Sequence, residues 1–219
     1  MNLRALLAFC VGVMIMAGLP HDGRTAGNTD AVTLAGEPGS EPTGFQSERT
    51  GKGTPGRWAI VTDPTAQGSR ALAQLSTDRT DYRFPLAIYQ PVSAGDVEVS
   101  VRFKAVGGQV DRAAGIAVRI ADADNYYVVR ANALEDNVNF YRVVRGVRQQ
   151  IHGIRTKVTS DEWHTLGLRA TGNQFAIVFD GRPLFTTDDS TFRGPGKVGL
   201  WTKADSITHF DSLTIHELR

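Results

Sequence analysis

The sequence has a single cysteine, Cys10, and this residue lies inside an apolar run over residues 5–19. One basic residue, Arg4, precedes the run, and Pro20 and a polar stretch follow it. The run is short for a membrane span and is typical of an export signal. We expect a signal peptide over residues 1–26 with cleavage after Ala26, and an uncleaved N-terminal anchor is the alternative.

Removal of Cys10 with the signal would leave no thiol in the mature chain. This excludes disulfides, and it excludes zinc sites or nucleophiles that depend on cysteine. Exported proteins without disulfides are more typical of bacteria than of animal extracellular domains. We therefore expect a secreted or periplasmic bacterial protein.

The sequence also lacks an excess of charge of either sign. It contains 24 Lys and Arg residues and 23 Asp and Glu residues. Cleavage after Ala26 removes Arg4, Arg24 and Asp22, which leaves 22 residues of each sign. A neutral chain without a Lys/Arg block gives no electrostatic reason to bind nucleic acid or an anionic membrane. We expect neither as a partner, apart from the export signal's own contact with the membrane.

Amphipathic helical patterns and internal repeats are not found in the sequence either. Residues 27–43 are rich in Gly, Pro, Glu, Thr and Asp, which predicts a flexible leader. From Trp58 onward, apolar and polar residues alternate, for example over residues 97–103, and turn residues separate the runs. Alternation of this kind places successive side chains on opposite faces of a strand. The pattern predicts one all-β domain over residues 44–219, a two-sheet antiparallel jelly-roll sandwich.

Two segments depart from simple alternation. Residues 126–129 are apolar at each position, which predicts a strand that is covered on both faces. Phe210 and Leu213 have opposite parity within the last predicted strand, and this predicts a β-bulge between them.

Several segments together resemble the concanavalin A-like domains of the 3-keto-disaccharide hydrolase group. These domains are related in fold to lectins, family 16 glucanases and laminin G-type modules. The segments that carry the resemblance are residues 95–103, 115–119, 125–131, 163–164, 199–202 and 210–213. The resemblance spans residues 45–218 and implies the jelly-roll fold. It does not fix the activity, because the group contains both hydrolases and modules that only bind.

The sequence lacks the carboxylate pattern of a family 16 glucanase. Such enzymes carry Glu, Asp and Glu at alternate positions of one strand, and a retaining glycosidase needs two carboxylates about 5–5.5 Å apart. No Glu-x-Asp-x-Glu occurs here, and no Gly-x-Ser-x-Gly elbow occurs. His152, His164, His209 and His216 show no metal-ligand spacing. These observations favour binding over catalysis.

Sugars bind to aromatic rings that stack on their C–H faces and to planar polar groups that bridge hydroxyls. The resemblance implies that the concave sheet of the jelly roll holds such groups. The candidate substrate-binding residues are Arg119, Arg130, Asn132, Tyr141, Trp201 and Lys203. We expect Arg119, Arg130 and Asn132 to converge on a glycan. Trp201 or Tyr141 would stack on a sugar ring, and packing of Trp201 in the core is an equal alternative.

The resemblance also implies a cation site. In related jelly rolls an acid of the closing strand helps to hold a calcium ion away from the sugar face. Asp211 is the residue that matches this acid, and calcium takes several oxygen ligands, including carboxylates. The alternative, which we prefer, is that Asp211 caps a turn or accepts hydrogen bonds from backbone amides.

The sequence thus predicts a secreted, lectin-like jelly-roll domain that holds a carbohydrate on its concave sheet. One alternative is a glycoside hydrolase or lyase of the 3-keto-disaccharide hydrolase type, acting on modified disaccharides, with Glu135, Asp136 or His209 as candidate bases. The other alternative is a laminin G-like module that binds protein.

Overall fold

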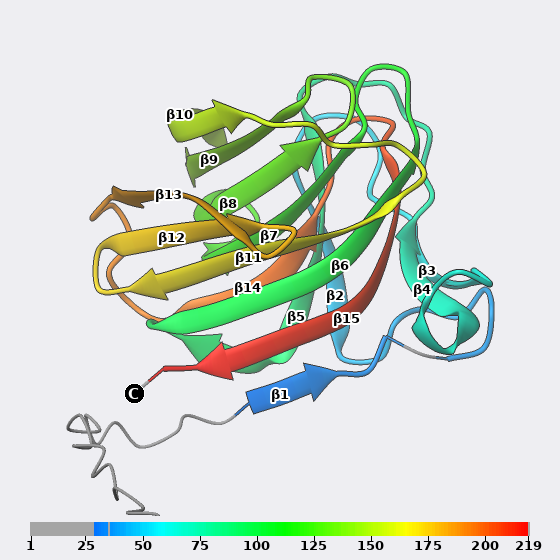
Figure 1. Ribbon diagram of the computed structural model, residues 1–219, viewed down its shortest axis with the longest axis horizontal. Coiled ribbons are helices and arrows are strands. Elements are labelled where there is room, and N and C mark those ends of the chain that lie inside the picture. Colours follow the sequence, from blue (N-terminus) through cyan, green and yellow to red (C-terminus); the bar gives the residue numbers. More distant parts are fainter. Residues whose placement is uncertain (1–28, 35, 219) are drawn as a thin grey trace, which may run out of the picture.

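A computed structural model describes residues 29–34 and 36–218, so the expected signal peptide over residues 1–26 lies outside the described residues. Within the described part, fifteen strands form two antiparallel sheets that pack against each other (Figure 1). The helical structure there is limited to a 3-10 turn, η1 (Gln67–Ser69). No helix among the described residues is long and apolar enough to cross a membrane. The predicted all-β jelly-roll sandwich is confirmed.

The eight-stranded sheet has the order β13-β12-β11-β6-β15-β4-β3, and β1 pairs with β15 beside this path. The strands of this sheet are β1 (Thr29–Val32), β3 (Trp58–Thr62), β4 (Arg70–Gln74), β6 (Val97–Gly107), β11 (Trp163–Thr171), β12 (Gln174–Phe179), β13 (Arg182–Asp188) and β15 (Ile207–Glu217).

The seven-stranded sheet has the order β10-β9-β8-β7-β14-β5-β2. Its strands are β2 (Phe45–Gly51), β5 (Arg83–Ala94), β7 (Ala113–Asp122), β8 (Asn125–Asn132), β9 (Asn137–Val144), β10 (Val147–Arg155) and β14 (Gly196–Trp201).

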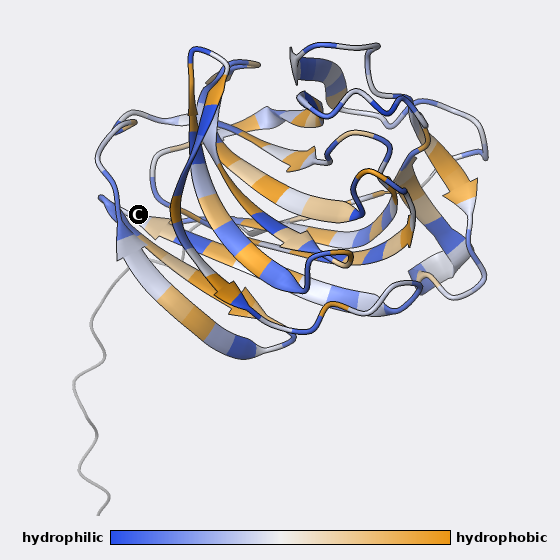
Figure 2. Ribbon diagram, turned by 90° about the horizontal axis from the view of Figure 1, so that it is seen from above, coloured by the Kyte–Doolittle hydropathy of each residue, from blue (hydrophilic) through white to orange (hydrophobic). Residues whose placement is uncertain are grey.

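The main core lies between the two sheets. Val99, Val101 and Phe103 of β6 are fully buried there and meet residues such as Phe140 from the facing sheet. Figure 2 shows the alternation of hydrophobic and hydrophilic residues along the strands that produces this arrangement. Full burial of each large apolar side chain stabilises the fold by about 1.5–3 kcal/mol.

A second apolar cluster covers the other face of the seven-stranded sheet. Residues 126–129 of β8 are all fully buried, which confirms the prediction of a strand covered on both faces. Tyr127 and Val129 belong to the main core, whereas Tyr126 and Val128 belong to the second cluster. The other members of the second cluster are Phe84, Leu86, Ile88, Ala113, Ala117, Ile120, Tyr141, Val143 and Trp201.

The seven-stranded sheet rolls around this second cluster. Four strands separate β10 from β5, a distance of about 24 Å in a flat sheet. Yet the backbone N–H of Arg148 in β10 donates to the hydroxyl of Tyr82, next to β5, at 2.7 Å. Likewise, the hydroxyls of Tyr126 in β8 and Thr50 in β2 lie 2.7 Å apart. The outer face of this sheet is therefore concave.

The described part of the expected leader belongs to the sheet. Residues 29–32 form β1, with Val32 opposite Leu213 of β15, and Val32 and Leu34 are both buried. The strand thus lies within the segment over residues 27–43 that was expected to be a flexible leader. Val32 at the end of β1 and Leu34 just after it are the buried apolar side chains here, and two such residues are too few to form a visible period.

The bulge predicted in the last strand is confirmed. The register between β15 and β6 shifts between Asp211 and Thr214, and Ser212 has a φ of 52°. The extra residue restores the parity of the strand, so Phe210 and Leu213 both enter the main core.

Candidate functional site

Trp201 of β14 forms the floor of the concave face. Its ring stacks on Phe84 at a centroid distance of 5.2 Å, and its Nε1–H donates to the hydroxyl of Tyr126 at 3.1 Å. The neighbouring strand carries Gly115, where a Cβ would lie 3.2 Å from the indole. The glycine therefore leaves the space in which the indole lies flat on the sheet.

Arg148 extends over this floor from the edge strand β10. Its guanidinium carbon lies 4.6 Å from the ring centroid of Tyr141, 4.7 Å from that of Phe84 and 5.9 Å from that of Trp201. These distances allow cation–π attraction to each ring. Its Nη1 is buried and has no hydrogen-bond partner among the described residues.

Arg130 of β8 lies beside the same aromatic group. Its guanidinium carbon is 5.6 Å from the ring centroid of Tyr141, and its Nη2 donates to Glu135 at 2.6 Å and to Asn137 at 2.7 Å. Burial opposes ionisation of Glu135, but the hydrogen bond from Asn137 and the charge of Arg130 lower the pKa of this carboxyl. The Nε of Arg130 is buried without a partner.

Lys203 connects two acids at the rim of this region. Its Nζ lies 2.7 Å from Asp81 and 3.0 Å from Asp111. Asn132 donates to the other oxygen of Asp111 at 2.9 Å. Burial raises the pKa of Asp111, although the charges of Lys203 and Arg130 oppose this effect. We use the term concave-face cluster for these residues as a group: Asp81, Phe84, Asp111, Arg130, Asn132, Glu135, Tyr141, Arg148, Trp201 and Lys203.

An open groove of about 480 Å³ lies elsewhere on the same face of the seven-stranded sheet. Ile88 and Ile120 line the groove and also belong to the second apolar cluster, so the groove lies over the same face of the sheet as that apolar cluster. Its polar lining comes from β2, β5, β14 and the turn between β7 and β8, with residues Gln46, Glu48, Gln90, Asp122, Asp124 and Lys197.

The structure brings most of the predicted sugar-binding residues together. The residues that meet in the concave-face cluster are Arg130, Asn132, Tyr141, Trp201 and Lys203. Within this group Trp201 and Asn132 have no exposed surface, and Arg130 is 2% exposed. The position of Trp201 therefore matches the alternative of core packing, and its ring is not available for stacking on a sugar in this conformation.

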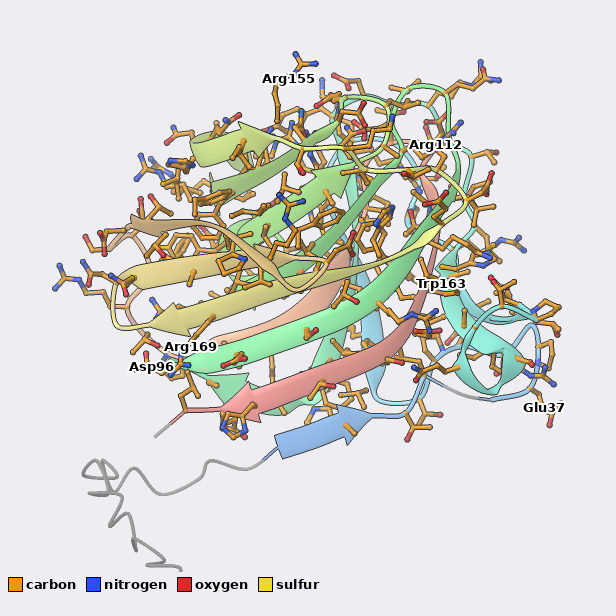
Figure 3. All side chains as sticks on the ribbon, viewed as in Figure 1. Glu37, Asp96, Arg112, Arg155, Trp163 and Arg169 are labelled. Atoms are coloured by element: carbon orange, nitrogen blue, oxygen red, sulfur yellow. The ribbon has the colours of Figure 1, made fainter. Side chains whose placement is uncertain are left out.

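Arg119 does not join the cluster. It has a φ of 50° at an irregular position of β7, and its guanidinium carbon lies 5.3 Å from the ring of Phe175 in the main core. Its Nη2 contacts Asp96 at 3.4 Å. Figure 3 shows Asp96 at one end of the molecule and Arg112, which follows Asp111 of the cluster, at the other. The expected convergence of Arg119 with Arg130 and Asn132 is not found, because the bulge turns Arg119 toward the opposite face.

Two residues of this region were not among the sequence candidates. Arg148 lies on the same face as Tyr141, and the alternation after the Arg145–Gly146 turn could have indicated this. Tyr82 is 40% exposed at the rim, and its ring lies 4.8 Å from that of Phe84. Its position depends on the rolled sheet, which local patterns do not reveal.

Asp211 lies on the eight-stranded sheet, and its surroundings do not suit calcium. One carboxylate oxygen accepts hydrogen bonds from the backbone of Gln67 and from Arg102, each at 2.9 Å. A guanidinium cation thus already holds the carboxylate. No group of three His, Cys, Asp or Glu side chains that could hold a metal occurs among the described residues. The alternative, in which Asp211 bonds a backbone amide, describes the contact that the structure contains.

The candidate bases do not lie around one reaction centre. Glu135 is paired with Arg130 in the concave-face cluster, whereas Asp136 accepts hydrogen bonds from Lys157 and the amide of Val158. His209 is on the eight-stranded sheet, with Nδ1 2.8 Å from Asp63. Each of the three candidate bases is thus held by a neighbouring side chain.

The chain is similar to known proteins both in sequence and in fold. The family described as the galactocerebrosidase C-terminal lectin domain matches residues 77–218. No curated protein sequence matches the chain. In structure, the chain is similar to the carbohydrate-binding module CBM66 from Bacillus subtilis, with 22% identity, coverage of 80% of this chain and 96% of the module, and a TM-score of 0.63.

It is also similar to a β-glucanase from Bacillus licheniformis, with 13% identity, 89% and 99% coverage and a TM-score of 0.53. At these identities the solved structures indicate the fold alone. The comparisons support the lectin and glucanase part of the predicted resemblance. A specific relation to the 3-keto-disaccharide hydrolases stays a prediction. The match over residues 77–218 shows that the chain belongs to the family of galactocerebrosidase C-terminal lectin domains.

Proposed function

We propose that this chain is a secreted carbohydrate-binding domain that holds a glycan on the concave face of its seven-stranded sheet. The lectin family supports carbohydrate as the class of ligand. The concave-face cluster supports the location, because the partly exposed guanidinium of Arg148 lies there over three aromatic rings. Planar groups of this kind bridge the hydroxyls of sugars.

The observation that carries this proposal is a guanidinium group without a protein partner on the concave face. The side chain of Arg148 is partly exposed and forms no hydrogen bond or ion pair among the described residues, and its guanidinium carbon lies 4.6 Å from the ring centroid of Tyr141. Hydroxyls of a bound glycan would accept hydrogen bonds from the accessible donors of this group.

The groove on the same face offers room for further sugar units. Amide and carboxylate side chains line it, including Gln46, Glu48 and Gln90, and these groups suit hydroxyl donors and acceptors. An oligosaccharide would therefore have one unit at the cluster and others along the groove. This arrangement favours chains over single sugars.

A glycan array with the purified protein tests the proposal, with Arg130→Gln as the site variant. Arg169→Gln is the control for the same change of charge away from the concave face, because Arg169 is half-exposed on the eight-stranded sheet (Figure 3). We expect binding that Arg130→Gln weakens about tenfold or more and that Arg169→Gln leaves unchanged. Circular dichroism of both variants confirms that they fold. The proposal is wrong if no glycan binds, or if folded Arg130→Gln binds as well as the wild type.

Secretion is the second part of the proposal and rests on the sequence of residues 1–26. Expression of the full chain in a bacterium, followed by N-terminal sequencing of the exported protein, should give a mature chain that begins at Gly27. A protein that stays in the cytoplasm with Met1 retained would contradict it.

A further inference from the structure

Arg148 differs from the other cations of the concave-face cluster in having no acidic partner. Arg130 is paired with Glu135, and Lys203 is paired with Asp81 and Asp111. Among the described residues, the guanidinium of Arg148 has neither an ion pair nor a hydrogen bond, and three aromatic rings hold it in place. The cluster therefore contains one guanidinium cation, that of Arg148, whose N–H groups donate no hydrogen bond to the protein.

The acids near Arg148 are already engaged. Asp81 is the acid whose ionisation Arg148 favours, but its closest partner is the Nζ of Lys203 at 2.7 Å. Glu135 accepts hydrogen bonds from Arg130 and Asn137. The carboxylates of the cluster thus pair with Lys203 and Arg130. Arg148 is the cation whose N–H groups remain available to a ligand.

We infer that the glycan held on the concave face is acidic and that Arg148 receives its anionic group, a carboxylate or a sulfate. This inference rests on the proposed function. A guanidinium fork and a carboxylate can form two parallel hydrogen bonds, which are stronger than bonds to a neutral hydroxyl. The rings of Phe84 and Tyr141 preorganise the guanidinium of Arg148, so binding of a ligand costs little side-chain conformational entropy.

The cluster as a whole does not attract anions over a long range. Its three cations, Arg130, Arg148 and Lys203, are matched by the three carboxylates Asp81, Asp111 and Glu135. The preference for an acidic sugar must therefore come from short hydrogen bonds. For this reason, the shape of the guanidinium matters more than its charge.

The test is an array of oligosaccharides in matched pairs, each pair having the same linkage and length with and without a charged group. The pairs are mannuronan and β-mannan fragments, and a sulfated and unsulfated galactan. We expect the carboxylate or the sulfate member of a pair to bind about tenfold or more tightly than its neutral partner. Which of the two does so identifies the anionic group.

Two substitutions at position 148 show whether Arg148 is responsible. Arg148→Gln and Arg148→Lys should each reduce acidic binding to the level of the neutral glycan, because lysine keeps the charge but loses the fork. Arg155→Gln is the control, since Arg155 lies on the same strand β10 and projects away from the body of the molecule (Figure 3). It should leave the preference unchanged.

The outcomes separate this inference from the proposed function. If neutral glycans bind as tightly as acidic ones, the inference is overturned while the proposed function stands. The inference is also overturned if acidic glycans are preferred but both folded Arg148 variants keep the preference. If no glycan of any kind binds, the proposed function and this inference are overturned together.

Discussion

At the scale of single residues, Trp201 illustrates how a potential ligand-binding ring becomes part of the core. Its indole is fully buried between Phe84 and the backbone at Gly115, and its N–H is satisfied by Tyr126. Arg148 covers it from the solvent side. Trp201 thus supports the site from beneath, and the polar groups above it are the ones that face a ligand.

Replacement of Trp201 by alanine should lower the free energy of unfolding by about 3–5 kcal/mol, because it removes a large buried side chain and leaves a cavity. Trp163→Ala is the comparison. Trp163 is only partly buried on the outer face of the other sheet, where Arg102 lies 4.5 Å from its ring. Its loss should cost about 1–2 kcal/mol. Urea unfolding measures the free energy of unfolding of both variants. Equal decreases in the two variants would show that Trp201 does not have the core role assigned to it.

Side-chain parity could predict which residues share a sheet face, but only where the strand is regular. The alternation of β8 and β9 correctly places Arg130, Asn132 and Tyr141 on one face. The same counting fails for Arg119, because Val118 and Arg119 both turn toward the main core at the irregular position of β7. A positive φ at an arginine has no marker in the sequence.

At the scale of elements, the turns that join the strands carry part of the specificity of the fold. Asp180 and Gly181 have φ values of 48° and 72° at the turn between β12 and β13. This is the geometry of a two-residue hairpin turn with a left-handed backbone, in which glycine is strongly preferred. The Asp-Gly pair in the sequence was therefore a reliable signal for a hairpin.

Gly181→Ala should destabilise the protein by about 1 kcal/mol, since alanine is strained at a positive φ. No atom lies within 4 Å of the added methyl group, so steric contact does not contribute. Gly194 is the matched control, because it has equal space around it and does not have a positive φ. Thermal unfolding should show a lower Tm for Gly181→Ala alone. Equal shifts in both variants would contradict the assignment of the effect to backbone strain.

The strands themselves were predictable because most of them alternate over many residues. Strand β1 was missed because it has four residues and is stabilised by pairing with β15, at the far end of the chain. Local composition dominated by Gly, Pro and Glu suggested a leader there. A contact this remote in sequence is set by tertiary packing and leaves no local pattern.

At the scale of the whole molecule, hydrogen-bonded carboxylates connect the stability of the fold to pH. Burial disfavours ionised Asp63, but hydrogen bonds from Lys104, His209 and Thr65 lower its pKa strongly. Backbone amides of Thr54 and Thr80 likewise lower the pKa of Asp78. Both carboxyls are thus more acidic in the folded chain than in the unfolded chain, where the value is about 3.9.

A group with a lowered folded pKa stabilises the protein above its unfolded pKa, and this contribution is lost as the pH falls below that value. The free energy of unfolding should therefore decrease as the pH is lowered from about 5 to about 2. Urea unfolding over a pH series measures the slope. Asp78→Asn should be less stable at neutral pH and show a shallower slope, whereas a flat or rising profile in the wild type would contradict the role of these carboxylates.

The curvature of the seven-stranded sheet is the feature of the whole molecule that the sequence concealed most completely. It depends on contacts such as those between Arg148 and Tyr82 and between Tyr126 and Thr50, which join strands that are not neighbours. These contacts place Arg148 over the rings of Tyr141 and Phe84. The sequence could thus predict the sandwich and most of the polar residues on one face, but it could not predict the cluster that the rolling of that face creates.

The most direct test of the central claim is a map of backbone amide chemical shifts, recorded while isotope-labelled protein is titrated with the oligosaccharide that binds best on the array. We predict that the largest changes cluster around Arg130, Tyr141 and Arg148 and extend along the groove to Gln46. Changes centred on Trp163 and the outer face of the eight-stranded sheet, with the concave face unaffected, would contradict the account.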